Sequence, residues 1–418
     1  MIRISTNEFM TGTLADILAQ ETSVNQLNQE IASGQTMQSA VDDPAGAGLA
    51  LSTAGQIQQL SFDTANAQSG AATIQNSLAS LQGINTLLSQ IQSVAVQAAN
   101  GTMNASDRAA LAGTVNSALQ QLIQLANTQS ADGSYIFAGS KSAAAPFVVQ
   151  TNGRIAFNGD ADTTSVTIAP SLSVPVSMSG QNIFMNIPSG NGSFSASASG
   201  ANTGTAYVTP AAVTNASQVL AEHLANTQFV VTFGAVSPTG SQTYTVTSGT
   251  GSPGTSGFAA TSGVVTSGSF ASGAGLNLGG MNLNVGGTPA SGDKFVVATS
   301  QNTDIFTIVQ NLATALSATA NKNDAQQLIE NAMAELGTAQ TTVLGAQATL
   351  GGNLSDIQSV QSLDENASTT QKAQLSSLQT ANLPQVITNY NEGVIALQAA
   401  EAAFARIQNL NLFQMIGH

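Results

Sequence analysis

The chain contains no cysteine and few charges of either sign. Without cysteine it can form neither a disulfide nor a thiolate metal site. Charged residues make up 7% of the sequence, compared with about 25% in a typical soluble domain, so the polar faces must consist of glutamine, asparagine, serine and threonine. Such faces can pack against neighbouring subunits without burying unpaired charge. The scarcity of charge therefore favours a protein that assembles.

Basic residues are the rarest charges. Eight lysines and arginines stand against 22 aspartates and glutamates, which gives a formal net charge of -14, and they form no cluster. A nucleic-acid backbone is bound by concentrated positive charge. We therefore expect no nucleic-acid partner.

Long hydrophobic runs are also missing. No stretch of about 18 consecutive apolar residues occurs, so we expect no membrane insertion. The first 13 residues contain one arginine and no apolar core of a signal peptide, so no cleaved secretory signal is visible.

Helical periodicity is clearest between residues 332 and 360. Apolar residues recur there with alternating spacings of four and three, the pattern of a heptad seam. The larger residues form one row and the alanines another, so a second helix can approach closely on the alanine side. A stripe of this kind belongs to an internal core helix or to a helix built for assembly, and one helix can serve both roles. The seam consists of Ala332, Leu336, Ala339, Val343, Ala346, Leu350, Ile357 and Val360.

The N-terminal third also has helical patterns. A capping box predicts a helix that begins near Thr6 and ends at Gly34. A second helix is expected from Pro44 to about Ala99, and a third from Asn104 to Asp132-Gly133. The inner face of the first helix is Leu14, Ile17, Val24, Leu27 and Ile31, and Leu78, Leu81 and Leu88 are inner positions of the second.

From Ser134 on, apolar residues recur at every second position and alternate with polar ones, which predicts strands and hairpins. We expect one or two antiparallel β domains between residues 142 and 300, with a loop-rich stretch at 249–275 and a short helix within 213–225. Helical periodicity returns at Ile305. The seam helix is expected to be capped by Asn321 with Asp324 and to break at 364–370.

A last helix is expected from Pro384, with the stripe Ile387, Tyr390, Val394, Leu397, Phe404 and Ile407. The predicted elements follow one another as helices, then strands, then helices again. This order predicts a multidomain α+β fold, in which a long antiparallel helical bundle or coiled coil from both chain ends carries an inserted β-rich region. We expect an axial coiled-coil domain (1–40 with 371–418), a helical-bundle rod domain (41–141 with 301–370) and an outer β domain (142–300, divided near 190).

No motif supports catalysis or a cofactor. Gly249, Gly251 and Gly254 have the spacing of a dinucleotide loop, but Pro253 and a Ser/Gly-rich tail follow instead of a helix. Asn158, Asp160 and Asp162 begin like a calcium loop, but its later glycine and glutamate are missing. The two histidines, His223 and His418, have no second ligand at a metal-binding spacing. We therefore expect no enzyme activity, cofactor or metal.

Both ends of the chain resemble the bacterial flagellin family. The N-terminal likeness runs through residues 1–6, 31–34 and 42–46 to Val94–Asn100, and the C-terminal likeness through Ala381–Leu383, Leu397–Ala399 and Leu410–Phe413. The stretch Tyr135–Lys141 followed by Pro146-Phe147 is similar to a hairpin of the family's junction proteins, which join the flagellar hook to the filament. Residues 190–290 match loosely.

This resemblance implies export through the flagellar type III apparatus to the extracellular flagellum, with help from an export chaperone. It implies a structural role at the hook-filament junction, with other copies of the chain in a ring and with the neighbouring hook-associated junction protein and flagellin as partners. A filament flagellin is the close alternative. A β-rich adhesin or binding module on a helical stalk is the alternative from another class.

The stripes also predict pairings. Ile17, Val24 and Ile31 are expected to face Val394, Leu397 and Phe404 in the innermost layer of the assembly. In the rod core, Ala339, Val343, Leu350 and Ile357 are expected to pack on Leu78, Leu81 and Leu88, with Leu336 in the same row.

Overall fold

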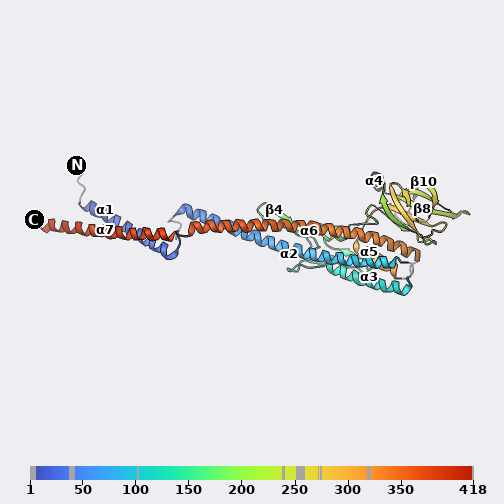
Figure 1. Cartoon of the computed structure of the whole chain (residues 1–418), viewed down its shortest axis with the longest axis horizontal. Helices are drawn as coiled ribbons and strands as arrows, with labels where there is room; N and C mark the ends of the chain where they lie inside the picture. Colours follow the sequence, from blue (N-terminus) through green and yellow to red (C-terminus); the bar gives the residue numbers. More distant parts are fainter. Residues whose placement is uncertain are drawn as a thin grey trace. The chain divides into compact units, whose positions relative to one another are not determined.

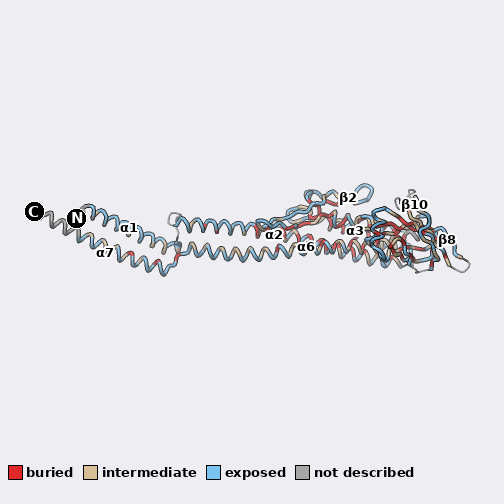
Figure 2. The backbone as a smooth tube through the Cα atoms, turned by 90° about the horizontal axis from the view of Figure 1, so that it is seen from above, coloured by how far each residue is buried: buried red, intermediate tan, exposed pale blue. Residues whose placement is uncertain are grey.

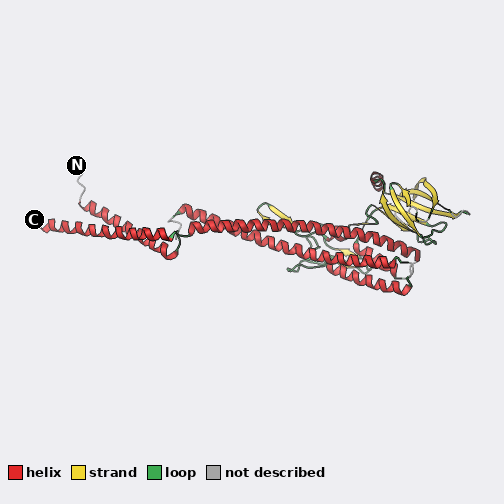
Figure 3. Ribbon diagram, viewed as in Figure 1, coloured by secondary structure: helices red, strands yellow, loops and turns green. Residues whose placement is uncertain are grey.

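The computed structural model describes residues 6–36, 43–100, 103–237, 241–250, 259–271, 273, 275–317 and 322–416. The chain divides into two units (Figure 1). The first, called the terminal unit here, comprises residues 1–65 and 360–418, and the second, called the central unit, comprises residues 66–359. The expected fold class, with helices from both chain ends and an inserted β-rich region, is confirmed (Figure 3).

The terminal unit consists of helix α1 (Thr6–Ser33), helix α7 (Leu383–Ile416), the beginning of α2 (Pro44–Ala98) and the end of α6 (Lys322–Gln379). Helix α1 ends where predicted, because Gly34 adopts a φ of 69° that residues with a side chain rarely take. The Gly34 carbonyl accepts a hydrogen bond from the amide of Ala381 at 2.9 Å, and the Thr36 amide donates to the carbonyl of Gln379. These bonds tie the end of α1 to the end of α6 and to the short connection between α6 and α7.

Two predicted helix ends are wrong. Helix α6 continues through residues 364–370 to Gln379, because this polar stretch has no proline or glycine and its threonines bond within the helix, Thr369 to the carbonyl of Glu365 and Thr370 to that of Asn366. Helix α3 (Ala105–Ala126) ends before Asp132, because the Asn127 side chain leaves the helix to exchange two hydrogen bonds with the backbone of Phe147.

The helical bundle of the central unit consists of α3, α5 (Ile305–Leu316) and the greater parts of α2 and α6. Asn104 caps α3 as predicted, with its side chain accepting from the Asp107 amide. Asp304 caps α5 by accepting from the Thr307 amide at 2.7 Å. Asn321, the expected cap of α6, lies outside the described residues. The buried faces of α3 and α5 pack together, and α2 contacts α3 through the bond from Ser80 Oγ to the Leu125 carbonyl.

Short strands lie beside these helices. Strands β1 (Phe147–Val149) and β2 (Ile155–Phe157) form one hairpin, β3 (Ser165–Ala169) and β4 (Leu172–Pro175) form another, and β5 (Ile187–Pro188) pairs with β14 (Asn302–Thr303). Between them, η1 (Gln181–Met185) is a short π-helix. Buried phenylalanines join the hairpins to α5, with ring centroids of Phe147 and Phe306 5.1 Å apart. Residues 136–140, expected as strand, form turns.

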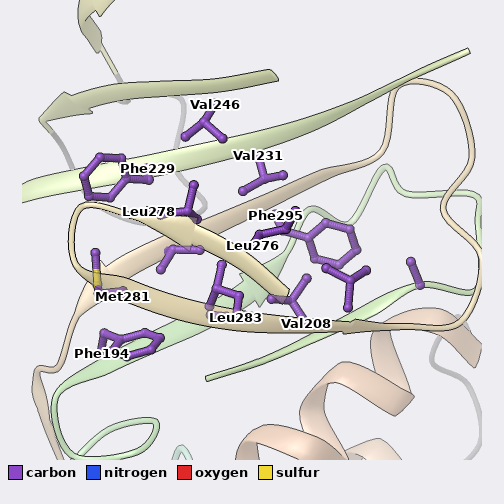
Figure 4. Packing of buried hydrophobic residues seen from close by; sticks show 14 of the residues in the cluster. Phe194, Val208, Phe229, Val231, Val246, Leu276, Leu278, Met281, Leu283 and Phe295 are labelled. Atoms are coloured by element: carbon purple, nitrogen blue, oxygen red, sulfur yellow. The ribbon is translucent and has the colours of Figure 1, made fainter. Parts of the chain in front are cut away.

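Residues 194–299, called the head here, form two packed antiparallel sheets. The strand order is β10-β9-β8-β13-β6 in the five-stranded sheet and β11-β12-β7 in the three-stranded sheet. Figure 4 shows side chains of both sheets, among them Phe295 and Leu283, in the core between them. The elements are β6 (Phe194–Ala198), β7 (Tyr207–Val213), α4 (Ala216–Leu224), β8 (Thr227–Val236), β9 (Gln242–Thr250), β10 (Ala259–Phe270), β11 (Gly275–Leu278), β12 (Met281–Gly286) and β13 (Lys294–Thr299).

The expected short helix is confirmed as α4. The expected loop at 249–275 is wrong for residues 259–270, while residues 251–258, 272 and 274 lie outside the part of the chain that the structure describes. Strand β10 occupies Ala259–Phe270, and it pairs with β9. The glycine and serine content of this stretch predicts a loop, but the stretch also contains the β-branched residues Thr261, Val264, Val265 and Thr266, and it pairs with β9 as the outer strand of the sheet.

Candidate assembly site

Helices α1 and α7 run antiparallel in the terminal unit. Near the middle of the pair, Gln20 Nε2 donates to the Gly393 carbonyl at 3.4 Å. A Cβ atom added at Gly393 would lie 3.0 Å from a methyl carbon of Val24. A glycine at this position therefore lets the two helices approach closely.

The residues predicted to form the axial coiled coil are buried to different extents in the pair of helices α1 and α7. Ile17 is buried, Val24, Leu27 and Ile31 are half-buried, and Leu14 is 45% exposed. In the register set by the contacts at Gly393 and at Gly34, Ile17 lies level with Leu397, whereas Phe404 lies level with the first turns of α1. On α7, Ile387 is exposed, Tyr390, Val394, Leu397 and Phe404 are half-buried, and the side chain of Ile407 lies outside the described residues.

Large apolar side chains remain exposed along the terminal unit. Figure 2 shows the helices of this unit mostly in the colour of exposed residues. An exposed apolar row on a helix marks an interaction surface when it is continuous. The exposed apolar side chains are Leu14, Leu18, Leu49, Leu51, Phe62, Leu363, Leu383, Ile387 and Ile395, the last of them 67% exposed.

The predicted rod-core residues lie in the central unit. Leu81, Leu88, Leu336, Val343, Leu350 and Ile357 are buried, and Leu78 is half-buried. Two contacts set the register of α2 and α6. Gln340 Nε2 donates to Ser89 Oγ at 3.1 Å, and a Cβ atom at Gly70 would lie 3.5 Å from Ile357 Cδ1. In this antiparallel register Leu78 lies level with Leu350, and Leu88 with residues 340 and 341.

A polar stripe on the same helix, which the sequence analysis did not single out, binds the backbone of the head. Gln327 is buried and exchanges two hydrogen bonds with Val208 of β7, accepting from its amide at 2.8 Å and donating to its carbonyl at 2.7 Å. Asn331 donates to the carbonyl of Ala196 in β6 at 2.8 Å. The two amides thus occupy backbone groups that a further strand would otherwise pair with.

Two more residues on the same face of α6, Glu335 and Thr338, continue this stripe. It is called the amide stripe here after its first two members, Gln327 and Asn331. Glu335 accepts from the Gly190 amide at 3.2 Å, and the Thr338 hydroxyl lies 3.4 Å from the Gly190 carbonyl. Burial raises the pKa of Glu335, while the Gly190 amide opposes this shift. The stripe consists of positions 327, 331, 335 and 338, with the same spacings of four and three as the apolar seam. This regular polar spacing was the signal in the sequence that could have revealed it.

Two carboxyl groups meet on α2 and α6 of the terminal unit. Asp63 is buried and accepts from Gln59 Nε2 at 2.9 Å. Burial, and secondarily the charge of Asp63, raises the pKa of Asp364. One oxygen of Asp364 is buried and has no hydrogen-bond partner in the described part of the chain.

Of the motifs set aside in the sequence, the run that begins like a calcium loop has a structural role, whereas Gly251, Gly254 and His418 lie outside the described residues. Asp160 accepts from the Ser140 hydroxyl and from the amides of Ser140 and Asp162, and these bonds lower its pKa. A cavity of about 280 Å³ lies between α2, residues 130–142 and the β3–β4 hairpin, and its lining is mostly hydroxyls with the carboxylate of Asp132. The described residues contain no group of three or more potential metal ligands and no helix long and apolar enough to cross a membrane.

Comparison with known proteins yields one consistent family. Residues 4–142 match the bacterial flagellin N-terminal helical region. Flagellar hook-associated protein 3 of Salmonella typhimurium is 29% identical over 191 residues, which cover 45% of this chain and 58% of that protein. A flagellin of Clostridium tyrobutyricum is 27% identical over 181 residues, 41% of this chain and 48% of that protein. The matches thus span about half the length of these relatives.

A solved structure extends the likeness. The crystal structure of flagellar hook associated protein-3 from Legionella pneumophila is 28% identical to this chain, with a TM-score of 0.67. The match covers 78% of this chain and 98% of that one. The likeness therefore includes the central unit and is not confined to the N-terminal helices.

Proposed function

We propose, on the premise that this chain belongs to the bacterial flagellin family, that it is a structural protein joining the flagellar hook to the filament. The observation that carries the proposal is the extent of the structural likeness to hook associated protein-3, which covers 78% of the chain. In sequence alone the two families of relatives are close, since hook-associated protein 3 of Salmonella typhimurium matches 45% of the chain and the flagellin of Clostridium tyrobutyricum 41%. The proposed role is mechanical rather than catalytic, and the proposed location is the extracellular flagellum.

The exposed apolar residues of the terminal unit support assembly as the activity of this part. We infer that they are covered by other copies of the chain in a ring, and by a hook-associated junction protein and flagellin on either side. Before assembly, a flagellar export chaperone would cover the same residues. Burying a large aliphatic side chain contributes roughly 1.5–3 kcal/mol, so several such contacts per subunit are enough to hold a ring together.

The three-part domain division and the axial pairing belong to this proposal. Because the chain has no cysteine, two introduced cysteines can be joined by a bifunctional maleimide without side reactions at other thiols. We expect Ile17→Cys with Leu397→Cys to cross-link within one chain, both in the monomer and after assembly. Ile17→Cys with Phe404→Cys is the control pair. Equal cross-linking of the two pairs would contradict the register.

The experiment that tests the function is complementation of a strain lacking the chain. The unaltered chain is expected to restore motility and to keep filaments attached to hooks. Ile395→Asp, which places a charge among the exposed apolar side chains of α7, is expected to be exported and folded but to reduce motility at least tenfold. Leu220→Asp, at a 59% exposed position of α4, is the matched control in the head. Full motility of the strain without the chain would overturn the proposal.

A filament flagellin is the alternative within the same family. The two functions differ in self-association, because a flagellin forms long filaments from the purified chain alone. Electron microscopy of the concentrated protein distinguishes them. Long uniform filaments of this chain would favour the flagellin alternative.

A further inference from the structure

The cavity of about 280 Å³ beside α2, called the hydroxyl cavity here, lies entirely within the central unit. Hydrogen bonds hold its walls in place. On one side the Tyr135 amide donates to the Ser142 carbonyl at 2.9 Å. On another side the Thr164 amide donates to Ser177 Oγ, also at 2.9 Å. The cavity is therefore formed in the chain itself, and a ligand does not have to order its walls.

The β3–β4 hairpin, which forms part of one wall, is attached to two helices. The Asn66 side chain of α2 donates to the Thr167 carbonyl at 3.3 Å. The Asn353 side chain of α6 donates to the Pro175 carbonyl at 2.8 Å. Because both bonds join the hairpin to long helices, this wall is as firmly placed as the helices themselves.

Hydroxyl groups dominate the lining of the cavity. Of the 13 described residues that line it, eight carry a hydroxyl. Each hydroxyl can donate one hydrogen bond and accept two. Five of these side-chain hydroxyls make no hydrogen bond to another residue in the described part of the chain, namely Ser69, Ser130, Tyr135, Ser142 and Thr164.

Asp132 is the one charged residue among the described residues of the lining. Its Oδ1 accepts from the Ser134 hydroxyl at 2.7 Å and from the Ser134 amide at 3.0 Å, and these bonds lower its pKa. The carboxylate is therefore ionised at neutral pH. Its second oxygen bonds to no other described residue and can accept hydrogen bonds from a ligand.

This lining selects against most classes of ligand. An apolar ligand would leave the hydroxyls without partners. An anion would meet the charge of Asp132 and no lysine or arginine among the described lining residues. An ammonium group only donates hydrogen bonds, so it would leave the protons of the free hydroxyls unpaired. A polyol donates and accepts through every hydroxyl, and it can therefore pair with all of these groups.

We propose that the hydroxyl cavity binds a single sugar ring. Its volume of about 280 Å³ lies at the lower limit of small-molecule sites, which measure about 300–1,000 Å³, so it has room for one ring but not for a chain of rings. The Asp132 carboxylate accepts from sugar hydroxyls, and the free serine, threonine and tyrosine hydroxyls donate and accept around it. This site is separate from the terminal unit and does not rest on the proposed role at the junction.

The test is the binding of hexoses to the full chain, measured by saturation-transfer NMR observed on the ligand. The probes are glucose, galactose and mannose, each as the free sugar and as its methyl glycoside. We expect at least one of them to bind with a dissociation constant of about 1–10 mM, because a single ring makes few contacts. A methyl glycoside that binds as tightly as its free sugar identifies the end of a glycan as the source, and binding of the free sugar alone identifies a free sugar.

Variants of lining residues place the binding in the cavity. Ser69→Leu fills the cavity from an exposed position of α2 and is expected to weaken binding at least tenfold. Ser93→Leu is the matched control, because Ser93 is also an exposed serine of α2 and lies about 36 Å along the helix from Ser69. Tyr135→Phe removes a free hydroxyl and keeps the ring, so the fold is retained, and binding is expected to weaken at least threefold.

Amide hydrogen exchange provides a second readout. Exchange at residues 130–142 is expected to slow with saturating sugar in the unaltered chain and in Ser93→Leu, but not in Ser69→Leu. Absence of binding by every probe at about 50 mM would overturn the proposal, since it would exclude even a weak site. So would equal binding by the Ser69→Leu variant and the unaltered chain. Binding of putrescine in preference to every sugar would overturn it as well, because Asp132 would then select a cation.

Discussion

The side-chain amide of Gln327 joins α6 to strand β7. It both accepts and donates a hydrogen bond, as the backbone of a neighbouring strand would do. Its oxygen and nitrogen bond to the amide and carbonyl of one residue, Val208, whose own side chain is fully buried. Removing a partner from a buried polar group costs about 1–3 kcal/mol, because the group left behind is desolvated and unpaired. This residue therefore contributes more to the attachment of the head than its polar character suggests.

We predict that Gln327→Ala destabilises the head by about 2–4 kcal/mol, since two backbone groups of β7 lose their partner. The measurement is amide exchange in β7 and β12. Gln326→Ala is the control, because the Gln326 side chain bonds to Glu330 within α6. Unchanged exchange at Val208 in the Gln327 variant would show that the two hydrogen bonds are not needed.

A second residue-scale prediction concerns Asp364, whose pKa in the folded chain is raised above its usual value of 3.8. A raised pKa means that the folded state prefers the protonated carboxyl, so stability is greatest below 3.8 and falls as the pH rises through the interval up to the raised pKa. Asp364→Asn removes this fall and is expected to stabilise the end of α6 at neutral pH by a few tenths of a kcal/mol.

Amide exchange of residues 360–379 at pH 7 and pH 3.5 measures this effect. The variant is expected to exchange more slowly than the unaltered chain at pH 7, and the difference should shrink at pH 3.5. Asp356→Asn changes an exposed aspartate of the same helix and is the control. A larger difference at pH 3.5 than at pH 7 would reverse the sign and contradict the prediction.

At the scale of elements, the seam of α6 holds the helical bundle of the central unit together. Leu350 is fully buried, whereas Leu344, in the same helix, is 50% exposed. Leu350→Ala is expected to cost about 2–5 kcal/mol, because truncation of a core leucine loses burial and leaves a cavity. Leu344→Ala should cost less than about 1 kcal/mol. Denaturant unfolding of the two variants provides the comparison, and equal costs would mean that the seam is not the core.

The elements also show what the sequence can predict. The starts of α2 and α3 and the end of α1 follow from Pro44, Asn104 and Gly34, because these residues act on the backbone next to them. The ends of α3 and α6 could not be predicted in this way. Helix α3 ends where Asn127 bonds to a residue 20 positions later, and α6 continues because nothing in its polar stretch stops it.

In the candidate sites, too, the sequence predicts what depends on neighbouring residues but not what depends on distant ones. Spacing alone identified the buried seam residues Leu336, Val343 and Leu350, because a heptad stripe reports directly on one helix face. The partners of the amide stripe lie more than 100 residues away, in strands β6 and β7 and in the turn at Gly190, and no local pattern connects Gln327 with Val208. Strand β10 was expected as loop, since its glycines and serines conceal a pairing that depends on β9.

At the scale of the whole molecule, burial is unevenly divided between the two units. The head and the bundle have buried cores, while α1 and α7 bury few side chains against one another (Figure 2). Helices gain most of their stability in proteins from the packing of one face. The terminal unit of a single chain is therefore the part that depends most on neighbours.

We predict fast amide exchange throughout α1 and α7 in the monomer, and exchange slowed by at least tenfold after assembly. The central unit serves as the internal control, since its exchange should be slow in both states. Strong protection of α1 in the isolated monomer would contradict the prediction, because it would mean that the α1–α7 pair is stable without further copies.

The amide stripe also determines how the head responds to its medium. Gln327 and Asn331 are neutral, so the hydrogen bonds by which they attach the head to α6 involve no pair of opposite charges. At a surface, dissolved ions screen charges that lie farther apart than about 10 Å at 0.1 M and about 3 Å at 1 M, but they have little effect on buried neutral hydrogen bonds. The hydrogen bonds between α6 and the head should therefore persist from low to high salt concentration. Over the same range, a contact made of lysine–glutamate pairs would weaken.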